Sequence, residues 1–361
     1  MRFCVVLFLL SLAGCSVARD LVPADATSAF PEGRTFLVVN ARTLAGDPTT
    51  LAVRDGSIVA LADLPRDAPR FDAAGATIVP AFIDAHVHFA YDPVAAAHFA
   101  GGIAAAIDLA SPIEAPRAPN TDPLTVLRAG PMITAVGGYP LNAWGRAGYG
   151  IECIDAATCA ARVDELVVAG AALIKVPIED AGGLDDASLI AIAQRTHAAH
   201  RLLVAHALSA RAIARAIRAG VDVLAHTPVV AIDDATSEAL RGRVVISTLG
   251  AFGGAQTTVA NLARLRAHGV DVVYGTDLGN TRTTGIDGHE VALLAAAGLD
   301  IDAIVAAATS SPARVFGLSR YGSLEPGHAA SFLLYRADLR ADPTQLARPD
   351  RVVMNGATVG P

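Results

Sequence analysis

Residues 78–88 read IVPAFIDAHVH, an apolar run that ends in two histidines one residue apart. A short apolar run is typical of a parallel strand that is buried on both faces. Alternate residues of a strand point to the same side, so we expect the side chains of His86 and His88 to point together. TIM-type barrels assemble their catalytic groups at the carboxyl ends of their strands. The stretch therefore predicts the first strand of such a barrel, with two metal-binding side chains at the barrel mouth.

Four later apolar runs also carry a metal-binding or titratable group. They are AALIKV at 171–176 with Lys175, RLLVAH at 201–206 with His206, GVDVLAH at 220–226 with His226, and VDVVYGTDLG at 270–279 with Asp277. A lysine or a carboxylate is costly to bury unless an opposite charge or a cation compensates it. For Lys175 the alternative is an ion pair with Glu179 or Asp180, which would leave a single metal ion. The pattern predicts that six side chains converge at one rim of the fold.

Residues 77–316 alternate short apolar runs with longer Ala-rich amphipathic stretches, as repeated βα units do. The predicted strands are at 77–84, 104–109, 132–136, 172–176, 202–206, 221–225, 244–248 and 270–274. Several helices between them are expected to end at a glycine, namely Gly170, Gly220 and Gly269, because glycine adopts the left-handed conformation that closes a helix. The predicted fold class is α/β, with a (β/α)8 TIM-type barrel at residues 77–316.

The segments on either side of the predicted barrel have β character. Residues 35–76 contain short β-type runs with the turn Asp55-Gly56, and residues 317–361 contain further runs with the turn Asn355-Gly356. The termini of a domain often lie close together. We therefore expect both ends of the chain to form one small β-sandwich domain beside the barrel.

The 361 residues are 53% hydrophobic and 17% charged, with a net charge of −7. So apolar a chain can bury a large core and offset the entropy cost of folding. A nucleic-acid partner is not expected, because phosphate binding needs a surplus of lysine and arginine on one face. The expected partner is a small-molecule substrate, and a homo-oligomer is left open.

Residues 1–14 are expected to be a targeting segment, with Arg2 followed by an apolar run that is shorter than the roughly 20 residues needed to span a bilayer. Residues 12–15, LAGC, resemble the lipobox of bacterial lipoproteins, which implies cleavage before Cys15 and a lipid on its thiol. By the same resemblance, Ser16 implies an exported protein on the outer membrane that faces the periplasm, with residues 15–34 as a tether. The alternatives are an ordinary secretory signal and a buried N-terminal strand.

Two further cysteines, Cys153 and Cys159, can pair in an oxidising compartment. The loop between them is short, so a disulfide would contribute roughly 2 kcal/mol as a local staple before a helix. Two free buried thiols are the alternative.

Several runs together resemble the amidohydrolase superfamily, in the branch of imidazolonepropionase-like and prolidase-like enzymes. These runs are VPAFIDAHVH and the later IKV, VAH, LAH and YGTDLG. The resemblance extends to the trailing β segment, where Ser331 stands in place of a usual aspartate. It implies two divalent metal ions, expected to be zinc. The implied ligands are His86, His88 and Asp277 for the more buried ion, His206 and His226 for the more exposed one, and Lys175, carboxylated on its side-chain nitrogen, as the bridge.

The resemblance implies hydrolysis, with Asp277 and Lys175 as catalytic residues. A hydroxide shared by the two ions would attack a carbonyl that one ion polarises, and Asp277 would take the proton and return it to the leaving amine. Deaminases of the superfamily generally carry a glutamate shortly after the histidine that matches His206, and residues 207–209 here are Ala-Leu-Ser. This favours cleavage of an amide-type C–N bond in a dipeptide, an N-acyl amino acid or a cyclic amide.

Substrate contacts are expected from the loops after the strands. The candidates are Tyr139, Trp144, Arg146 and Arg282, and either arginine can bind a substrate carboxylate. Two other functions stay open: a lactonase or other esterase that uses the same site, and a binding lipoprotein without catalytic activity.

Overall fold

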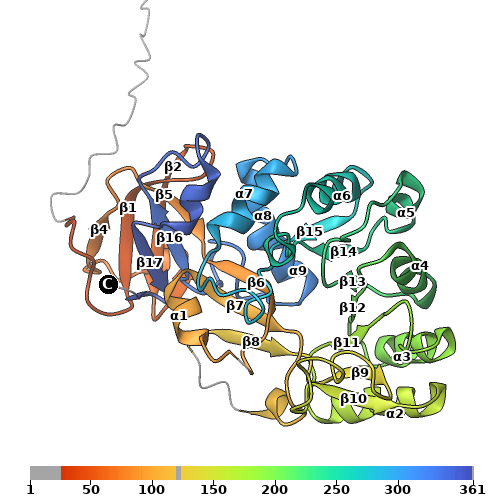
Figure 1. The fold of residues 1–361 in the computed structure, drawn as a ribbon. Helices are drawn as coiled ribbons and strands as arrows, with labels where there is room; N and C mark the ends of the chain where they lie inside the picture. Colours follow the sequence, from red (N-terminus) through yellow and green to blue (C-terminus); the bar gives the residue numbers. More distant parts are fainter. Residues whose placement is uncertain (1–25, 91, 119–122, 360–361) are drawn as a thin grey trace, which may run out of the picture.

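The computed structural model describes residues 26–90, 92–118 and 123–359. The fold is α/β: a strand-rich part from both ends of the described chain lies beside a larger part in which strands alternate with helices (Figure 1). The predicted signal peptide at 1–14 and the predicted lipid on Cys15 lie outside the described residues. Within the described ranges, no helix is both long and apolar enough to cross a membrane.

The larger part contains two long ladders of parallel strands and the separate parallel pair of β9 (Met132–Ala135) and β10 (Gly150–Cys153). The first ladder runs β6 (Phe82–Val87), β7 (Ile103–Asp108) and β8 (Thr125–Arg128). The second runs β11 (Ile174–Pro177), β12 (Leu203–His206), β13 (Val223–Leu224), β14 (Val244–Ile246) and β15 (Asp271–Val273). Backbone hydrogen bonds link the two ladders: the N–H of Ala85 donates to Tyr274 at 3.0 Å, and the N–H of Ala172 donates to Arg128 at 2.9 Å.

This arrangement is consistent with a TIM-barrel-type domain, but the closed barrel that we predicted is not confirmed, because the ladder of the described strands is not continuous. The ladder is broken between β8 and β11 and between β15 and β6. The third predicted strand, at 132–136, corresponds to β9, which pairs with β10, whereas β8 pairs with β7 and lies outside every predicted strand. Between β8 and β9, Gly130 has a φ of 73° and Pro131 has no N–H to donate to a ladder.

Helices α3 to α6 lie along the outer side of strands β11 to β15 (Figure 1). The helices are α1 (Ala95–Ala100), α2 (Ala156–Val168), α3 (Asp186–Ala198), α4 (Ala210–Ala219), α5 (Asp234–Ala239), α6 (Gln256–Ala267), α7 (Gly288–Ala296), α8 (Ile301–Ala308) and α9 (Ser310–Val315). As predicted, the three glycines that follow α2, α4 and α6 have positive φ, which lets the chain leave each helix. Short 3₁₀ helices lie at η1 (Leu61–Asp63), η2 (Ala115–Arg117), η3 (Gly250–Phe252) and η4 (Pro343–Ala347).

The strand-rich part is one eight-stranded sheet in the order β18-β17-β16-β5-β1-β2-β3, with β4 paired to β1. Its strands are β1 (Phe36–Arg42), β2 (Pro48–Arg54), β3 (Ser57–Val59), β4 (Arg70–Asp72), β5 (Thr77–Pro80), β16 (Phe332–Tyr335), β17 (Arg351–Met354) and β18 (Ala357–Val359). The described residues place these strands in a single sheet, so the predicted sandwich of two sheets is not confirmed. Strand β5 pairs antiparallel with β16 and leads directly into β6, which fixes the first strand of the larger part against this sheet.

Candidate metal centre

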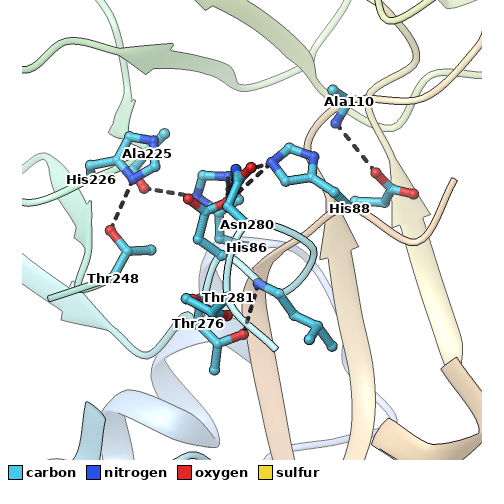
Figure 2. Close-up of polar contacts among 12 residues, drawn as sticks. His86, His88, Ala110, Ala225, His226, Thr248, Thr276, Asn280 and Thr281 are labelled. Carbon is cyan, nitrogen blue, oxygen red and sulfur yellow. Dashed lines mark hydrogen bonds and ion pairs between the residues drawn. The ribbon is translucent and has the colours of Figure 1, made fainter. Parts of the chain in front are cut away.

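The structure brings the six predicted metal-binding side chains together at the carboxyl ends of the parallel strands. They line one cavity of about 240 Å³, to which β6 contributes His86, the position directly after β6 His88, β11 Lys175, β12 His206, the loop after β13 His226, and the loop after β15 Asp277. Parallel strands point their carboxyl ends to the same rim, so residues that are distant in sequence meet there. Figure 2 shows three of these histidines pointing toward one another.

Two histidines and one carboxylate form the tightest group in this cavity. The Nε2 atoms of His86 and His88 are 3.2 Å apart and lie 3.4 and 3.2 Å, respectively, from Oδ1 of Asp277. All three side chains are buried. In the described part of the chain, this is the group of His, Cys, Asp and Glu side chains whose donor atoms lie close enough to hold one ion. Imidazole nitrogens with a carboxylate oxygen are a donor set that zinc accepts.

The hydrogen bond on the far side of the His86 ring fixes which nitrogen faces this group. Nδ1 of His86 lies 3.0 Å from the carbonyl oxygen of Ala225, which can only accept, so Nδ1 carries the hydrogen (Figure 2). Burial, followed by the positive charge of Lys175, lowers the pKa of His86 well below its ordinary value. The ring is therefore neutral, and Nε2 presents a lone pair toward His88 and Asp277. A carbonyl behind a ligating histidine is a common support in metal sites, so the donor set fits a divalent cation.

His206 and His226 extend the group toward Lys175. The ring centroid of His226 lies 4.7 Å from that of His86 and 4.9 Å from that of His206. Nδ1 of His226 is 3.0 Å from the hydroxyl oxygen of Thr248 (Figure 2). Burial is the largest cause that lowers the pKa of both rings, to about 4 for His206 and well below the ordinary value for His226. Both imidazoles are therefore neutral, the form in which histidine binds metals.

Lys175 is the sole lysine among the 361 residues, and its side chain is 1% exposed. Burial lowers its pKa to about 7, while the negative charge of Asp277 acts in the opposite direction. The two acids that we considered as ion-pair partners make other contacts. The carboxylate of Glu179 accepts from the backbone N–H of Tyr139 at 3.1 Å, and the carboxylate of Asp180 accepts from the hydroxyl of Ser209.

A buried carboxylate behind the ligands, Asp84, ties two strands together. Its Oδ1 accepts from the backbone N–H groups of His86 and Thr276, both at 3.0 Å, and its Oδ2 accepts from the hydroxyl of Thr276 at 2.5 Å. Oδ2 also lies 3.2 Å from Nε2 of His98, whose Nδ1 accepts from the N–H of Gly285 at 2.9 Å. Asp84 was not among the predicted site residues, although an aspartate inside the apolar run IVPAFIDAHVH is a signal for such a role. The His98 side chain is fully buried.

Asp277 itself has an uncommon backbone conformation. Its φ is 56°, in the left-handed region that few residues other than glycine, asparagine and aspartate occupy. The side-chain amide of Asn280 donates to its Oδ1 at 3.0 Å. Such conformations cluster at functional sites, where the surrounding contacts hold them.

The structure brings two of the four predicted substrate residues to this cavity. Tyr139 and Trp144 line it, and Nε1 of Trp144 donates to the hydroxyl oxygen of Tyr139 at 2.8 Å. Arg146 instead lines a separate open groove, where its Nε donates to the carbonyl of Leu141. Arg282 is 78% exposed and pairs with Asp92 at 3.1 Å. Neither arginine is among the described residues that line the metal cavity.

The loop that carries Tyr139 and Trp144 is followed by a disulfide. Cys153 at the end of β10 is joined to Cys159 in α2, with an S–S distance of 1.96 Å. Of the two alternatives for these cysteines, the structure has the bonded form, and it anchors β10 to the helix that follows.

Comparison with known proteins identifies the family. The amidohydrolase family model matches residues 157–359, more than half of the chain, and the chain belongs to this family. The family membership predicted from the sequence is thereby confirmed. An uncharacterized protein of Mycobacterium tuberculosis is 27% identical over 328 residues, which cover 80% of this chain and 86% of that protein.

Solved structures share the fold along most of the chain. A Xaa-Pro dipeptidase with methionine bound in its active site has a TM-score of 0.76 at 16% identity, covering 91% of this chain and 100% of that one. Phenylurea hydrolase B has a TM-score of 0.72 at 17% identity, covering 90% and 96% of the two chains. At these identities the likeness concerns the fold.

Proposed function

We propose that the protein is a metal-dependent hydrolase that cleaves an amide-type C–N bond in a small molecule. The observation that carries the proposal is the convergence of His86, His88 and Asp277, three buried donors, at the carboxyl ends of the strands. The reaction class is that of the amidohydrolase family, and both solved relatives named above are hydrolases by name.

We further propose that two divalent ions, zinc by the nature of the donors, bind here. His86, His88 and Asp277 would hold one ion, His206 and His226 the other, and Lys175, carboxylated by carbon dioxide, would contribute to both. Only a neutral amine adds to carbon dioxide, and Lys175 lies buried among these groups, where desolvation favours the neutral form. Bound zinc supplies a Lewis acid and lowers the pKa of water toward neutrality.

The residues of the chain have separate tasks in this reaction. The carboxylate of Asp277 accepts a proton from the attacking water and returns it to the leaving amine. Asn280, which donates to the same carboxylate, orients it toward the cavity. Asp84 keeps the strand of His86 in register with the segment that carries Asp277, because it hydrogen bonds to both.

The closure of the barrel and the location of the protein in the cell are also proposals. We propose that the strands of the larger part close into a (β/α)8 barrel. We propose further that residues 1–14 are a lipoprotein signal and that a lipid on Cys15 anchors the protein at the outer membrane, facing the periplasm. The disulfide between Cys153 and Cys159 supports an exported protein, because disulfides persist in oxidising compartments.

Metal content and lysine carboxylation test the centre directly. We expect metal analysis of protein prepared with bicarbonate to give near two ions per chain, with a marked loss in Lys175→Ala and no loss in the surface control Arg211→Ala. Since Lys175 is the sole lysine, ¹³C-bicarbonate should give one lysine carbamate signal, absent from the Lys175→Ala spectrum. Equal metal content in parent and Lys175→Ala would remove the lysine from the centre.

Turnover distinguishes the proposed reaction from its alternatives. A panel of dipeptides, N-acyl amino acids, hydantoins and lactones should show cleavage of amide substrates by the metal-loaded protein. Cleavage confined to lactones would favour an esterase, and no turnover with full metal loading would favour a binding protein.

A further inference from the structure

Three aromatic rings line the cavity beside the metal ligands. We call Tyr139, Trp144 and Phe252, which all line the cavity, the aromatic wall. Each ring of the wall lies against a different histidine of the centre: Tyr139 against His206 at 5.0 Å between centroids, Trp144 against His88 at 5.3 Å, and Phe252 against His226 at 5.1 Å. Any substrate carbonyl that reaches the centre therefore brings its substituents against these rings.

Hydrogen bonds hold the first two rings in place. The backbone N–H of Tyr139 donates to Glu179, and the indole N–H of Trp144 donates to the Tyr139 hydroxyl oxygen. Because an indole N–H is a donor only, the Tyr139 oxygen acts as acceptor in this contact and its own O–H can still donate to a ligand.

The third ring is held by a buried acid on another helix. Phe252 belongs to η3, and the carboxylate of Glu290 in α7 accepts from the N–H of Leu249 at 3.0 Å and from that of Gly250 at 2.7 Å. The side chain of Glu290 is 1% exposed. Since the wall is anchored before a ligand arrives, binding costs little ordering entropy.

The charges around the cavity disfavour an anionic substituent at the wall. No arginine is among the described residues that line the cavity, because Arg146 and Arg282 lie elsewhere, and Lys175 lies with the metal ligands. A substrate carboxylate against the wall would lose its hydration without a facing guanidinium, which is unfavourable. A flat apolar group gains free energy from burial and from ring-to-ring contact.

We propose that the aromatic wall binds an uncharged aromatic group of the substrate, so that the enzyme prefers aryl-substituted amides without a free carboxylate. This inference rests on the proposed function and narrows its substrate class. The wall would orient the ring while the Tyr139 hydroxyl donates to a substrate oxygen.

Binding can be measured apart from turnover, because Trp144 is the sole tryptophan of the chain. We expect benzamide to change the Trp144 fluorescence saturably in metal-loaded protein, and N-acetylglycine to bind at least ~10-fold more weakly, a difference of about 1.4 kcal/mol. Arg282→Ala is the matched control and should leave both titrations unchanged. Equal or tighter binding of N-acetylglycine, or weaker binding of it in Arg282→Ala, would overturn the inference.

The rates of hydrolysis of three related amides test the same preference for an uncharged aromatic group during turnover. We expect kcat/KM for N-benzoylglycinamide to exceed, by at least ~10-fold, the values for N-benzoylglycine, which has a carboxylate in place of the terminal amide, and for N-acetylglycinamide, which lacks the ring. Phe252→Leu should reduce the advantage of the ring, mainly through KM. Equal rates on all three would overturn the inference and leave the hydrolase proposal standing. No hydrolysis of any amide, with benzamide still bound, would overturn the hydrolase proposal and leave the binding inference standing.

Discussion

Replacing Glu290 by glutamine should flatten the dependence of stability on pH. The carboxyl of Glu290 is buried, and this burial raises its pKa from 4.5 to about 7, although backbone N–H groups of Leu249 and Gly250 favour its charged form. The folded chain therefore binds this proton more tightly than the unfolded chain does. The stabilisation from the protonated carboxyl is fully present below pH 4.5 and is lost as the pH rises through about 7. At about 1.4 kcal/mol per pH unit, the loss amounts to about 3 kcal/mol.

The assay is chemical unfolding followed by circular dichroism at a series of pH values between 4 and 8, for the parent, Glu290→Gln and the surface control Glu325→Gln. The free energy of unfolding of the parent and of the control should fall more steeply with pH than that of Glu290→Gln, by about 3 kcal/mol over the range. Parallel curves for all three proteins would refute the reasoning, because they would mean that Glu290 ionises equally easily in the folded and unfolded chains.

Three further outcomes are expected. Cys153→Ser should lower the free energy of unfolding by roughly 2 kcal/mol under oxidising conditions, the loop-entropy value for so short a loop, and dithiothreitol should then have no further effect. Gly285→Ala should destabilise by about 1–3 kcal/mol in thermal or chemical unfolding, since φ at Gly285 is +77° and a Cβ there would lie 2.7 Å from Cα of Gly101. Chelation of bound metal should lower the Tm in calorimetry, by the equivalent of about 2.7 kcal/mol if the ion had been present at a hundred times its Kd.

The metal-binding side chains could be predicted because each one lies within or just after an apolar run. His86, His206 and His226 lie at the ends of buried β runs. The carboxyl ends of parallel strands share one rim, so these side chains meet in space although they are distant in sequence. The family resemblance assigned roles to these positions. The two ends of the chain were likewise readable as β segments from their turns, and the structure pairs them in one sheet.

What could not be predicted depends on contacts that no local pattern encodes. Strands β8 and β9 are separated by Gly130 and Pro131, and the pairing of β10 with β9 joins segments on either side of a long loop. The positions of Arg146 and Arg282 depend on how two loops fold back, which hydrophobic periodicity does not determine. The buried carboxylate of Glu290 accepts a hydrogen bond from the N–H of Gly250 in η3, and the two residues are 40 positions apart in sequence.

The pairing of β5 with β16 has a consequence for how the chain folds. The two strands lie at opposite ends of the parallel-strand part, so their ladder closes a very long loop, and such closures are slow. On the ribosome, β1 to β5 emerge early and present an unpaired edge until β16 follows. We expect a late kinetic phase, visible in hydrogen exchange, in which the edge of β5 becomes protected last. A circular permutant that places β16 to β18 immediately before β1 should shorten this phase.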